Sequence, residues 1–203
     1  MEKVETEVKF YVVEIDSIRE QISQLGAVSQ GRFFEKNLRF EDADKSFKAN
    51  KTVLRLRQDN KAKLTFKSKP LESDNQFKKL EELEVEVSDF ETMNRILQVL
   101  GFHCEQIYEK WRETLVLNQT QFCIDSMPYG DFLEIEGPEE NIKDFASQLG
   151  LQWNQRIILN YIEIFDILKE NLNLNFNDIS FENFNMVNVD LAIYLNQLTA
   201  EQS

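Results

Sequence analysis

The sequence is short of histidine, cysteine and glycine, with one, two and six of them among 203 residues. Cys104 and Cys123 form no CxxC pair, and together with the single His103 they cannot complete a Cys/His zinc site. We expect both cysteines to be buried free thiols in a reducing compartment. No glycine-rich GxxxxGK loop is present, so any phosphate groups would have to be held by side chains.

Long apolar stretches are also missing. No run approaches the roughly 20 apolar residues that a helix needs to cross a bilayer. The start, MEKVETEVKF, has no basic segment followed by an apolar one, which is the pattern of a signal peptide. We therefore expect a cytoplasmic protein with no membrane partner.

Positive charge is in deficit, because 23 lysines and arginines face 36 acidic residues, a net charge of −13. A strongly acidic chain repels the backbone of DNA and RNA, so we expect no nucleic-acid partner. A small anionic ligand is still compatible with this charge, since a local basic site can outweigh a distant acidic surface. The hydrophobic fraction of 42% is typical of a folded protein rather than a disordered one.

The charge pattern divides the chain near residue 170. Lys169 is the last basic residue, and five acidic residues follow it. The segment 171–188 is rich in asparagine and phenylalanine, and residues 190–198 have helical spacing of apolar side chains. We predict a main domain over residues 1–170 and an acidic extension over 171–203, partly helical and docked on the main domain.

The main domain contains an internal similarity. Residues 5–10 and 82–87 alternate as strands with acidic faces, and each is followed by an amphipathic helix that ends in Leu-Gly and then by a basic strand. Ser17 and Ser88 are the predicted helix caps. A weaker third copy begins at residue 132. The order predicts two similar halves that close one barrel, with residues 41–51 and 68–79 as loops.

Charges on the polar strand faces are segregated by sign. The acidic faces are Glu5/Glu7, Glu82/Glu84/Glu86 and Glu134/Glu136, and the basic faces are Arg55/Arg57, Lys61/Lys63/Lys67/Lys69 and Lys110/Arg112. For one strand, solvent exposure with pairing across neighbours is a sufficient explanation. Three like charges on one exposed face repel each other, however, and a closed barrel with a charged interior explains all the strands together.

Such a barrel has apolar outer faces, and we expect amphipathic helices to cover them. Trp111, which alternates with Lys110 and Arg112, is predicted to lie under a helix. Inside, carboxylates suit hard divalent cations such as Mg²⁺ or Mn²⁺. Arginine offers paired donors that match phosphate oxygens, and lysine adds positive charge.

The motifs resemble those of the CYTH superfamily, the triphosphate tunnel metalloenzymes. ETEVK at residues 5–9 matches the ExExK signature, and LRLR, LTFK, EELEVE, KWR, Asp125 and GDFLEIE follow in the family's order over residues 3–165. The resemblance implies an α+β fold with an eight-stranded antiparallel β-barrel, the triphosphate tunnel. It also implies a small-molecule triphosphate substrate and a need for Mg²⁺ or Mn²⁺.

Site residues follow from the same resemblance. It implies metal ligation by Glu5, Glu7, Asp125, Glu134 and Glu136. It implies phosphate contacts by Lys9, Arg55, Arg57, Lys67, Lys110 and Arg112. The chain departs from the family at residues 159–161, where Leu-Asn-Tyr stands in place of Lys-Ser-Tyr, which puts one phosphate-binding lysine in doubt.

Three functions fit these residues. The first is a metal-dependent triphosphatase acting on inorganic, nucleoside or thiamine triphosphate. The second is a class IV adenylate cyclase that converts ATP to cyclic AMP and pyrophosphate, and the third is a non-catalytic module that binds polyphosphate or a nucleotide. The complete set of carboxylates favours an enzyme. The sequence leaves the oligomeric state open, with a homodimer as one option.

Overall fold

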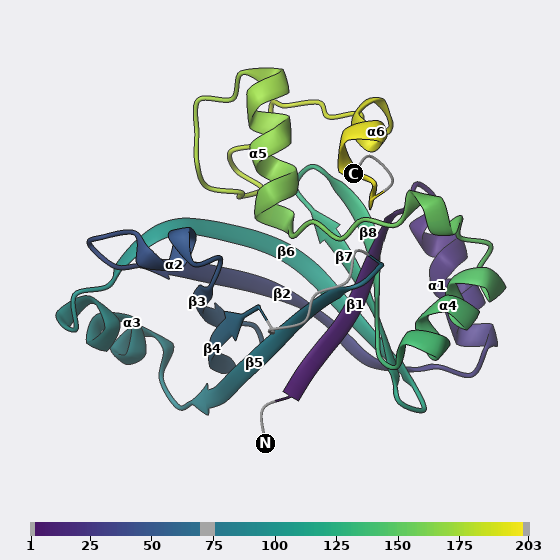
Figure 1. The fold of residues 1–203 in the computed structure, drawn as a ribbon, viewed down its shortest axis with the longest axis horizontal. Coiled ribbons are helices and arrows are strands. Elements are labelled where there is room, and N and C mark those ends of the chain that lie inside the picture. Colours follow the sequence, from purple (N-terminus) through teal and green to yellow (C-terminus); the bar gives the residue numbers. More distant parts are fainter. Residues whose placement is uncertain (1–2, 70–75, 201–203) are drawn as a thin grey trace.

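Eight antiparallel strands form a closed barrel in the computed structural model, which describes residues 3–69 and 76–200 (Figure 1). The strand order around the barrel is β1-β5-β4-β3-β2-β6-β7-β8, and β8 pairs with β1 to close it. The predicted fold class, an α+β protein with an eight-stranded antiparallel barrel, is therefore confirmed. The strands are β1 (Lys3–Tyr11), β2 (Val28–Glu41), β3 (Val53–Gln58), β4 (Ala62–Ser68), β5 (Lys78–Val87), β6 (His103–Leu117), β7 (Thr120–Met127) and β8 (Gly130–Glu136).

The helices lie outside the barrel, and two of them occupy equivalent places in the predicted halves. The units β1–α1–β2 and β5–α3–β6 follow the same order, and α4 follows β8 as the weaker third copy predicted. The helices are α1 (Ile15–Gln24), α2 (Ser46–Ala49), α3 (Phe90–Val99), α4 (Glu139–Gln148), α5 (Tyr161–Leu172) and α6 (Leu195–Leu198), with 3₁₀ turns η1 (Trp153–Gln155) and η2 (Leu191–Tyr194).

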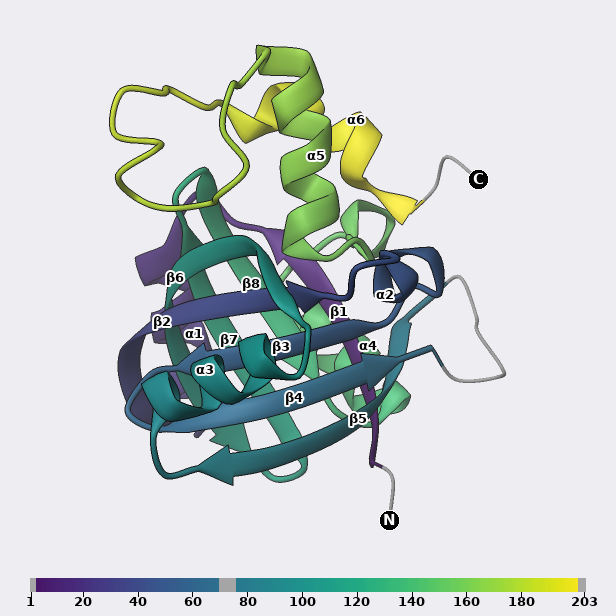
Figure 2. The same cartoon turned by 90° about the vertical axis from the view of Figure 1, so that its left-hand side faces the viewer.

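Apolar faces of the strands point outward, as predicted, and two groups of helices cover part of them (Figure 2). Helices α1 and α4 bury Ile18, Ile22 and Ile142 in one cluster with side chains of β1, β7 and β8. Helix α3 buries Phe90 and Leu97 in a second cluster with β2 and β3. Because apolar groups are buried outside the strands, the interior of the barrel is left to polar side chains.

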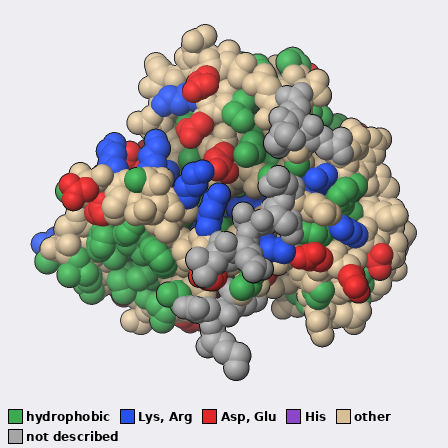
Figure 3. All heavy atoms as spheres, viewed as in Figure 1, with side chains coloured by type: hydrophobic (Ala, Val, Ile, Leu, Met, Phe, Trp, Pro, Cys, Tyr) green, Lys and Arg blue, Asp and Glu red, His purple; other side chains and the backbone are tan. Residues whose placement is uncertain are grey.

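Part of the outer face has no helix over it. Leu83 and Val85 on β5 are 54% and 56% exposed, and hydrophobic side chains gather on that side of the molecule (Figure 3). The expectation that a helix covers Trp111 is wrong, because its side chain is 39% exposed and packs edge-on against Phe34, with ring centroids 5.4 Å apart. Helices α1, α3 and α4 have ten residues each, about 15 Å of length, which cannot cover the whole barrel.

Local details also differ from the sequence expectations. Both cysteines are free thiols, but Cys123 is buried whereas Cys104, near the start of β6, is exposed. The predicted loop over residues 41–51 contains α2, and β5 begins at Lys78, earlier than the predicted strand. The Asp89 side chain, not Ser88, caps α3 by accepting a hydrogen bond from the Thr92 backbone nitrogen. Helix α1 begins at Ile15, ahead of Ser17, and its cap makes no side-chain hydrogen bond. Residues 70–75 of the other predicted loop lie outside the described residues.

The C-terminal part of the chain packs over one end of the barrel (Figures 1 and 2). Helix α5 runs across residue 170, and the following residues return to β6, where the Ile179 backbone pairs with Ile107 and Glu109 through two 2.8 Å hydrogen bonds. Phe184, Leu191 and Leu198 are buried in one cluster with α5. Among the described helices, none has the length and apolar content to span a membrane.

Candidate functional site

The strand register places the predicted site residues on one face of the sheet, the inner face. Residues directly opposite each other in antiparallel strands share a face, so each pairing extends the inner set around the barrel. The pairs include Lys9 with Glu134, Glu7 with Glu136, Arg112 with Asp125, Lys110 with Glu35, and Lys67 with Glu82.

These residues surround a cavity of about 1540 Å³ that runs into the barrel. All the predicted phosphate-binding residues line it, together with Glu5, Glu7, Glu134 and Glu136. Among the described residues, fourteen lysines and arginines and eleven carboxylates line the cavity, a surplus of three positive charges in a chain whose net charge is −13. Lysine and arginine side chains are visible where this face opens below α5 (Figure 3). The interior is therefore the locally basic site that the acidic composition allowed.

Arg55 and Arg57 project from β3 into the cavity and keep unused hydrogen-bond donors. Arg55 Nη1 donates to the Tyr108 hydroxyl at 3.2 Å, whereas its Nε is buried and has no hydrogen-bond partner. The nearest carboxylate oxygens lie 3.4–3.7 Å from the Arg57 guanidinium, and its buried Nε also makes no hydrogen bond. Buried donors without partners are costly, so these two guanidinium groups are prepared to bind an anion.

The densest charge cluster lies where β6, β7, β8 and β1 meet. Lys9 Nζ is 2.7 Å from Glu134 Oε1, and Arg112 bridges Glu134 and Asp125, donating from Nε to Asp125 Oδ1 at 2.6 Å. Lys110 Nζ donates to Asp125 Oδ2 at 3.0 Å. Burial alone would raise the pKa of Glu134, but Lys9 and Arg112 hold it well below its ordinary value. Glu134 is therefore an anion near neutral pH and can hold a cation.

Carboxylates on β1 and β5 are each held by a lysine. Lys67 forms ion pairs with Glu5 and, at 3.2 Å, with Glu82, while Lys78 Nζ donates to Glu7 Oε1 at 2.6 Å. Burial acts to raise the pKa of Glu5, yet the charge of Lys67 lowers it to about 2. In this half of the barrel, too, the carboxylates are paired with lysines, and Glu5 is ionised near neutral pH.

Four cavity residues that contact the predicted site residues were not among them: Glu35, Lys78, Tyr108 and Tyr161. Lys78, at the start of β5, lies on the same strand face as Glu82 and Glu84. Glu35 lies on the same face of β2 as Arg39. Strand alternation therefore indicates both residues, although neither belongs to a run of like charge. Tyr161 begins α5 rather than a strand, so strand alternation gives no signal for it.

The chemistry of the donor set suits a hard divalent cation. Glu5, Glu7, Glu134 and Glu136 line one cavity, and the β1–β8 register sets Glu7 opposite Glu136. In the described ranges, however, no three acidic, cysteine or histidine side chains converge as a ready-made metal site. The lysines and arginines that neutralise these carboxylates would have to give way to the metal, so the ligand set remains a prediction.

Asp125 is the exception among the predicted metal ligands, because it does not line the cavity. Its side chain is fully buried, and its oxygens accept hydrogen bonds from Lys110, from Arg112 and, at 2.7 Å, from the Tyr161 hydroxyl. These three donors all line the cavity, so their hydrogen bonds lie between the Asp125 carboxylate and the cavity. Its position fits the holding of cationic side chains.

Glu35→Gln is expected to reduce the acid sensitivity of the fold. Burial favours the neutral form of Glu35, but Lys110, Arg112 and Arg57 lower its pKa to about 2. A lowered pKa contributes stability above the ordinary value near 4.5, and this contribution is lost as pH falls toward 2. It is on the order of 3 kcal/mol. Tm measured from pH 7 to 2 should fall less steeply in the variant, from a lower starting value.

Glu91→Gln on the exposed side of α3 is the control and should leave the pH profile unchanged. Part of the acid sensitivity should remain in Glu35→Gln, because Glu5 titrates in the same range. A Glu35→Gln profile parallel to that of the wild type would show that the ion pairs of Glu35 do not stabilise the fold.

The chain is similar to known proteins over most of its length. The CYTH domain model matches residues 3–163. A Methanocaldococcus jannaschii protein named "Putative adenylate cyclase" is 29% identical over 143 residues, which cover 70% of this chain and 81% of that protein. The match to the family model ends just after the start of α5.

Solved structures with a similar fold are also known. The PH1012 protein of Pyrococcus horikoshii is 32% identical, with a TM-score of 0.66 over 78% of this chain and 98% of that one. A protein of Hippeastrum, described as a "Putative adenylyl cyclase" with a dominant triphosphatase activity, is 16% identical. Its TM-score is 0.58 over 80% of this chain and 95% of that one, and at this identity the likeness shows the fold alone.

Proposed function

The chain belongs to the CYTH domain family, and on that basis we propose that it is an enzyme that hydrolyses a triphosphate inside its barrel with the help of Mg²⁺ or Mn²⁺. The substrate is inorganic triphosphate or the triphosphate group of a nucleotide or of thiamine triphosphate.

One observation carries the proposal: the half-buried arginines of β3, whose Nε atoms are buried without hydrogen-bond partners, face a cavity with surplus positive charge. A single phosphate offers too few oxygens for donors spread over β1, β3, β4 and β6. A triphosphate offers a row of them. Arginine matches these oxygens with paired donors, and lysine contributes charge from a flexible stem.

In the proposed mechanism, six side chains bind the phosphate oxygens and hold the triphosphate in one orientation: Lys9, Arg55, Arg57, Lys67, Lys110 and Arg112. Glu5, Glu7, Glu134 and Glu136 would hold the divalent cation, and the bound cation would supply positive charge to neutralise the phosphoryl group. Phosphoryl transfer depends mainly on such positioning and neutralisation. The buried walls of the barrel limit access of bulk water, which strengthens each of these interactions.

A second candidate is cyclisation of ATP, because the Methanocaldococcus jannaschii relative bears the name "Putative adenylate cyclase". Incubation with inorganic triphosphate, ATP and thiamine triphosphate, with Mg²⁺ or Mn²⁺, separates the candidates. We expect orthophosphate as a product. Cyclic AMP with pyrophosphate would instead establish the cyclase, and tight binding without products would establish a binding module. Failure to bind any triphosphate would overturn the proposal.

Replacing Arg55 and Arg57 together by alanine is expected to weaken triphosphate binding about a hundredfold or more and phosphate binding far less. Each charge-assisted hydrogen bond contributes about 1.5–3 kcal/mol, and a ligand with more anionic oxygens makes more of them. Calorimetric titration with inorganic triphosphate and with phosphate measures both affinities. Arg95→Ala on the exposed side of α3 is the control. Equal losses for the two ligands would assign the arginines a structural or only generally electrostatic role.

A further inference from the structure

Tyr161 connects the C-terminal helix to the charge cluster of the barrel. Its hydroxyl donates to Asp125 Oδ2 at 2.7 Å, the same oxygen that accepts the hydrogen bond of Lys110 at 3.0 Å. Arg112 Nε donates to the other oxygen, Oδ1, at 2.6 Å. Asp125 is fully buried, so water cannot replace any of these donors.

The aromatic ring of Tyr161 faces two of the cations. Lys9 Nζ lies 4.5 Å from the ring centroid and Lys110 Nζ lies 5.1 Å from it. Ammonium groups within about 6 Å of an aromatic face are attracted to it, more strongly when the pair is buried. Both lysines line the cavity. One side chain therefore restrains Lys9 through its ring and Lys110 through both its ring and Asp125.

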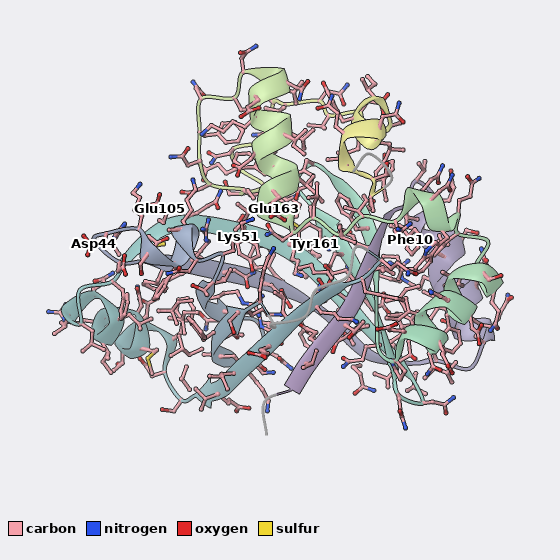
Figure 4. The ribbon with its side chains drawn as sticks, in the orientation of Figure 1. Phe10, Asp44, Lys51, Glu105, Tyr161 and Glu163 are labelled. Carbon is pink, nitrogen blue, oxygen red and sulfur yellow. The ribbon has the colours of Figure 1, made fainter. Side chains whose placement is uncertain are left out.

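Tyr161 is itself held firmly. It is the first residue of α5, where the Asn160 side chain accepts hydrogen bonds from Ile162 N and Glu163 N in a capping box. The Tyr129 hydroxyl donates to the Tyr161 carbonyl oxygen at 2.8 Å, and the Phe132 ring packs edge-on at 5.3 Å. Figure 4 shows Tyr161 where α5 meets the barrel. A side chain fixed in this way can impose a geometry on its two lysine neighbours, Lys9 and Lys110.

We infer that Tyr161 is a positioning residue for anion binding, acting with Asp125 to aim Lys110 and Arg112 into the cavity. Asp125 then serves as an anchor for these cations rather than as a metal ligand. A metal ligand would have to give up three donors that already satisfy it. The identity of the anion, a triphosphate, rests on the proposed function, whereas the geometry of the cluster does not.

Tyr161→Phe tests the inference, because it keeps the ring and removes only the hydroxyl. In calorimetric titration with inorganic triphosphate, we expect its affinity to fall about tenfold, the size typical of a hydrogen bond to a charged group. Tyr129→Phe is the matched control, since its hydroxyl donates to the backbone carbonyl of Tyr161 and not to Asp125, and the Asn160 capping box still holds that backbone in the variant. It should lose stability to a similar extent and keep its affinity within about twofold.

A second measurement does not depend on any ligand. The Arg112 Nε–H, which donates to Asp125, should exchange with solvent more rapidly in Tyr161→Phe than in the wild type, as followed by ¹⁵N NMR, and should be unchanged in Tyr129→Phe.

The outcomes are distinct. A wild-type protein that does not bind triphosphate would refute the proposed function, and the exchange of Arg112 would then decide this inference alone. Unchanged exchange in Tyr161→Phe would overturn it. Wild-type affinity in Tyr161→Phe, or equal losses of affinity in the two tyrosine variants, would overturn it as well.

Discussion

Glu7→Ala is expected to lower triphosphate turnover about a hundredfold or more while the barrel stays folded. Glu7 is 7% exposed, lines the cavity on β1 and lies opposite Glu136 on β8. Even the removal of groups that only support metal ligands costs ten- to a hundredfold in affinity or activity. Turnover across a titration of Mg²⁺ and of Mn²⁺, with circular dichroism to verify folding, measures the effect. Near-normal turnover in a folded variant would remove Glu7 from the metal site.

Lys78→Ala is the matched variant, because it breaks the same 2.6 Å ion pair and leaves the carboxylate in place. If Glu7 holds the metal, Glu7→Ala should need more Mn²⁺ for half-maximal turnover, whereas Lys78→Ala should raise the KM for the triphosphate. The same change of metal dependence in both variants would mean that the ion pair, and not the carboxylate, matters for turnover.

Truncation after Asn171 is expected to destabilise the protein by at least about 3 kcal/mol. It removes Ile179, Phe184, Leu191 and Leu198, which are at most 5% exposed and pack against α5. Burial of each such side chain contributes about 1.5–3 kcal/mol before the cost of ordering the segment is subtracted. For a chain of this size, the change corresponds to a fall in Tm of roughly 6–12 °C.

Turnover at low temperature should survive this truncation, because every predicted ligand and Tyr161 lie before the cut. Met186→Ala, at a side chain that is 92% exposed, is the control and should change neither Tm nor turnover. Loss of turnover at an unchanged Tm would instead place the extension in the active site. Asn177, which lines the cavity, would then be the residue to examine first. The division near residue 170 stays a proposal until this measurement.

The sequence was sufficient to predict the barrel and its charged interior. Alternation assigns each strand residue to one of two faces, and Glu82 and Glu84 of the acidic run line the cavity. Glu86, at the end of the same run, is exposed and pairs with the exposed Lys61, because the strand face runs on past the cavity into solvent. The register then places Glu82 and Glu84 beside Lys67 and Thr65 of β4. A strong local signal and a closed topology were consistent with each other.

Alternation does not identify neighbours that are distant in the sequence, and this explains what was missed. β1 pairs with β5 and β2 with β6, so the partners of Glu7 and Glu35 come from segments about 70 residues away. Tyr161 reaches Asp125 from a helix, where the period of the strands does not apply. The exposure of Trp111 depends on the length of the helices, which a local pattern does not relate to the circumference of a barrel.

The paired charges of the cavity have a consequence for selectivity, because the barrel is in effect an ion exchanger. Its lysines are already paired with counter-ions of the protein itself, the carboxylates of Glu5, Glu7 and Glu134. An incoming anion must displace several of these at once, and a weakly charged one gains too little to do so. The carboxylates released from their lysines would then be free to bind a divalent cation. Affinity should therefore rise steeply with the charge of the anion and should depend on the metal, even before any bond is broken.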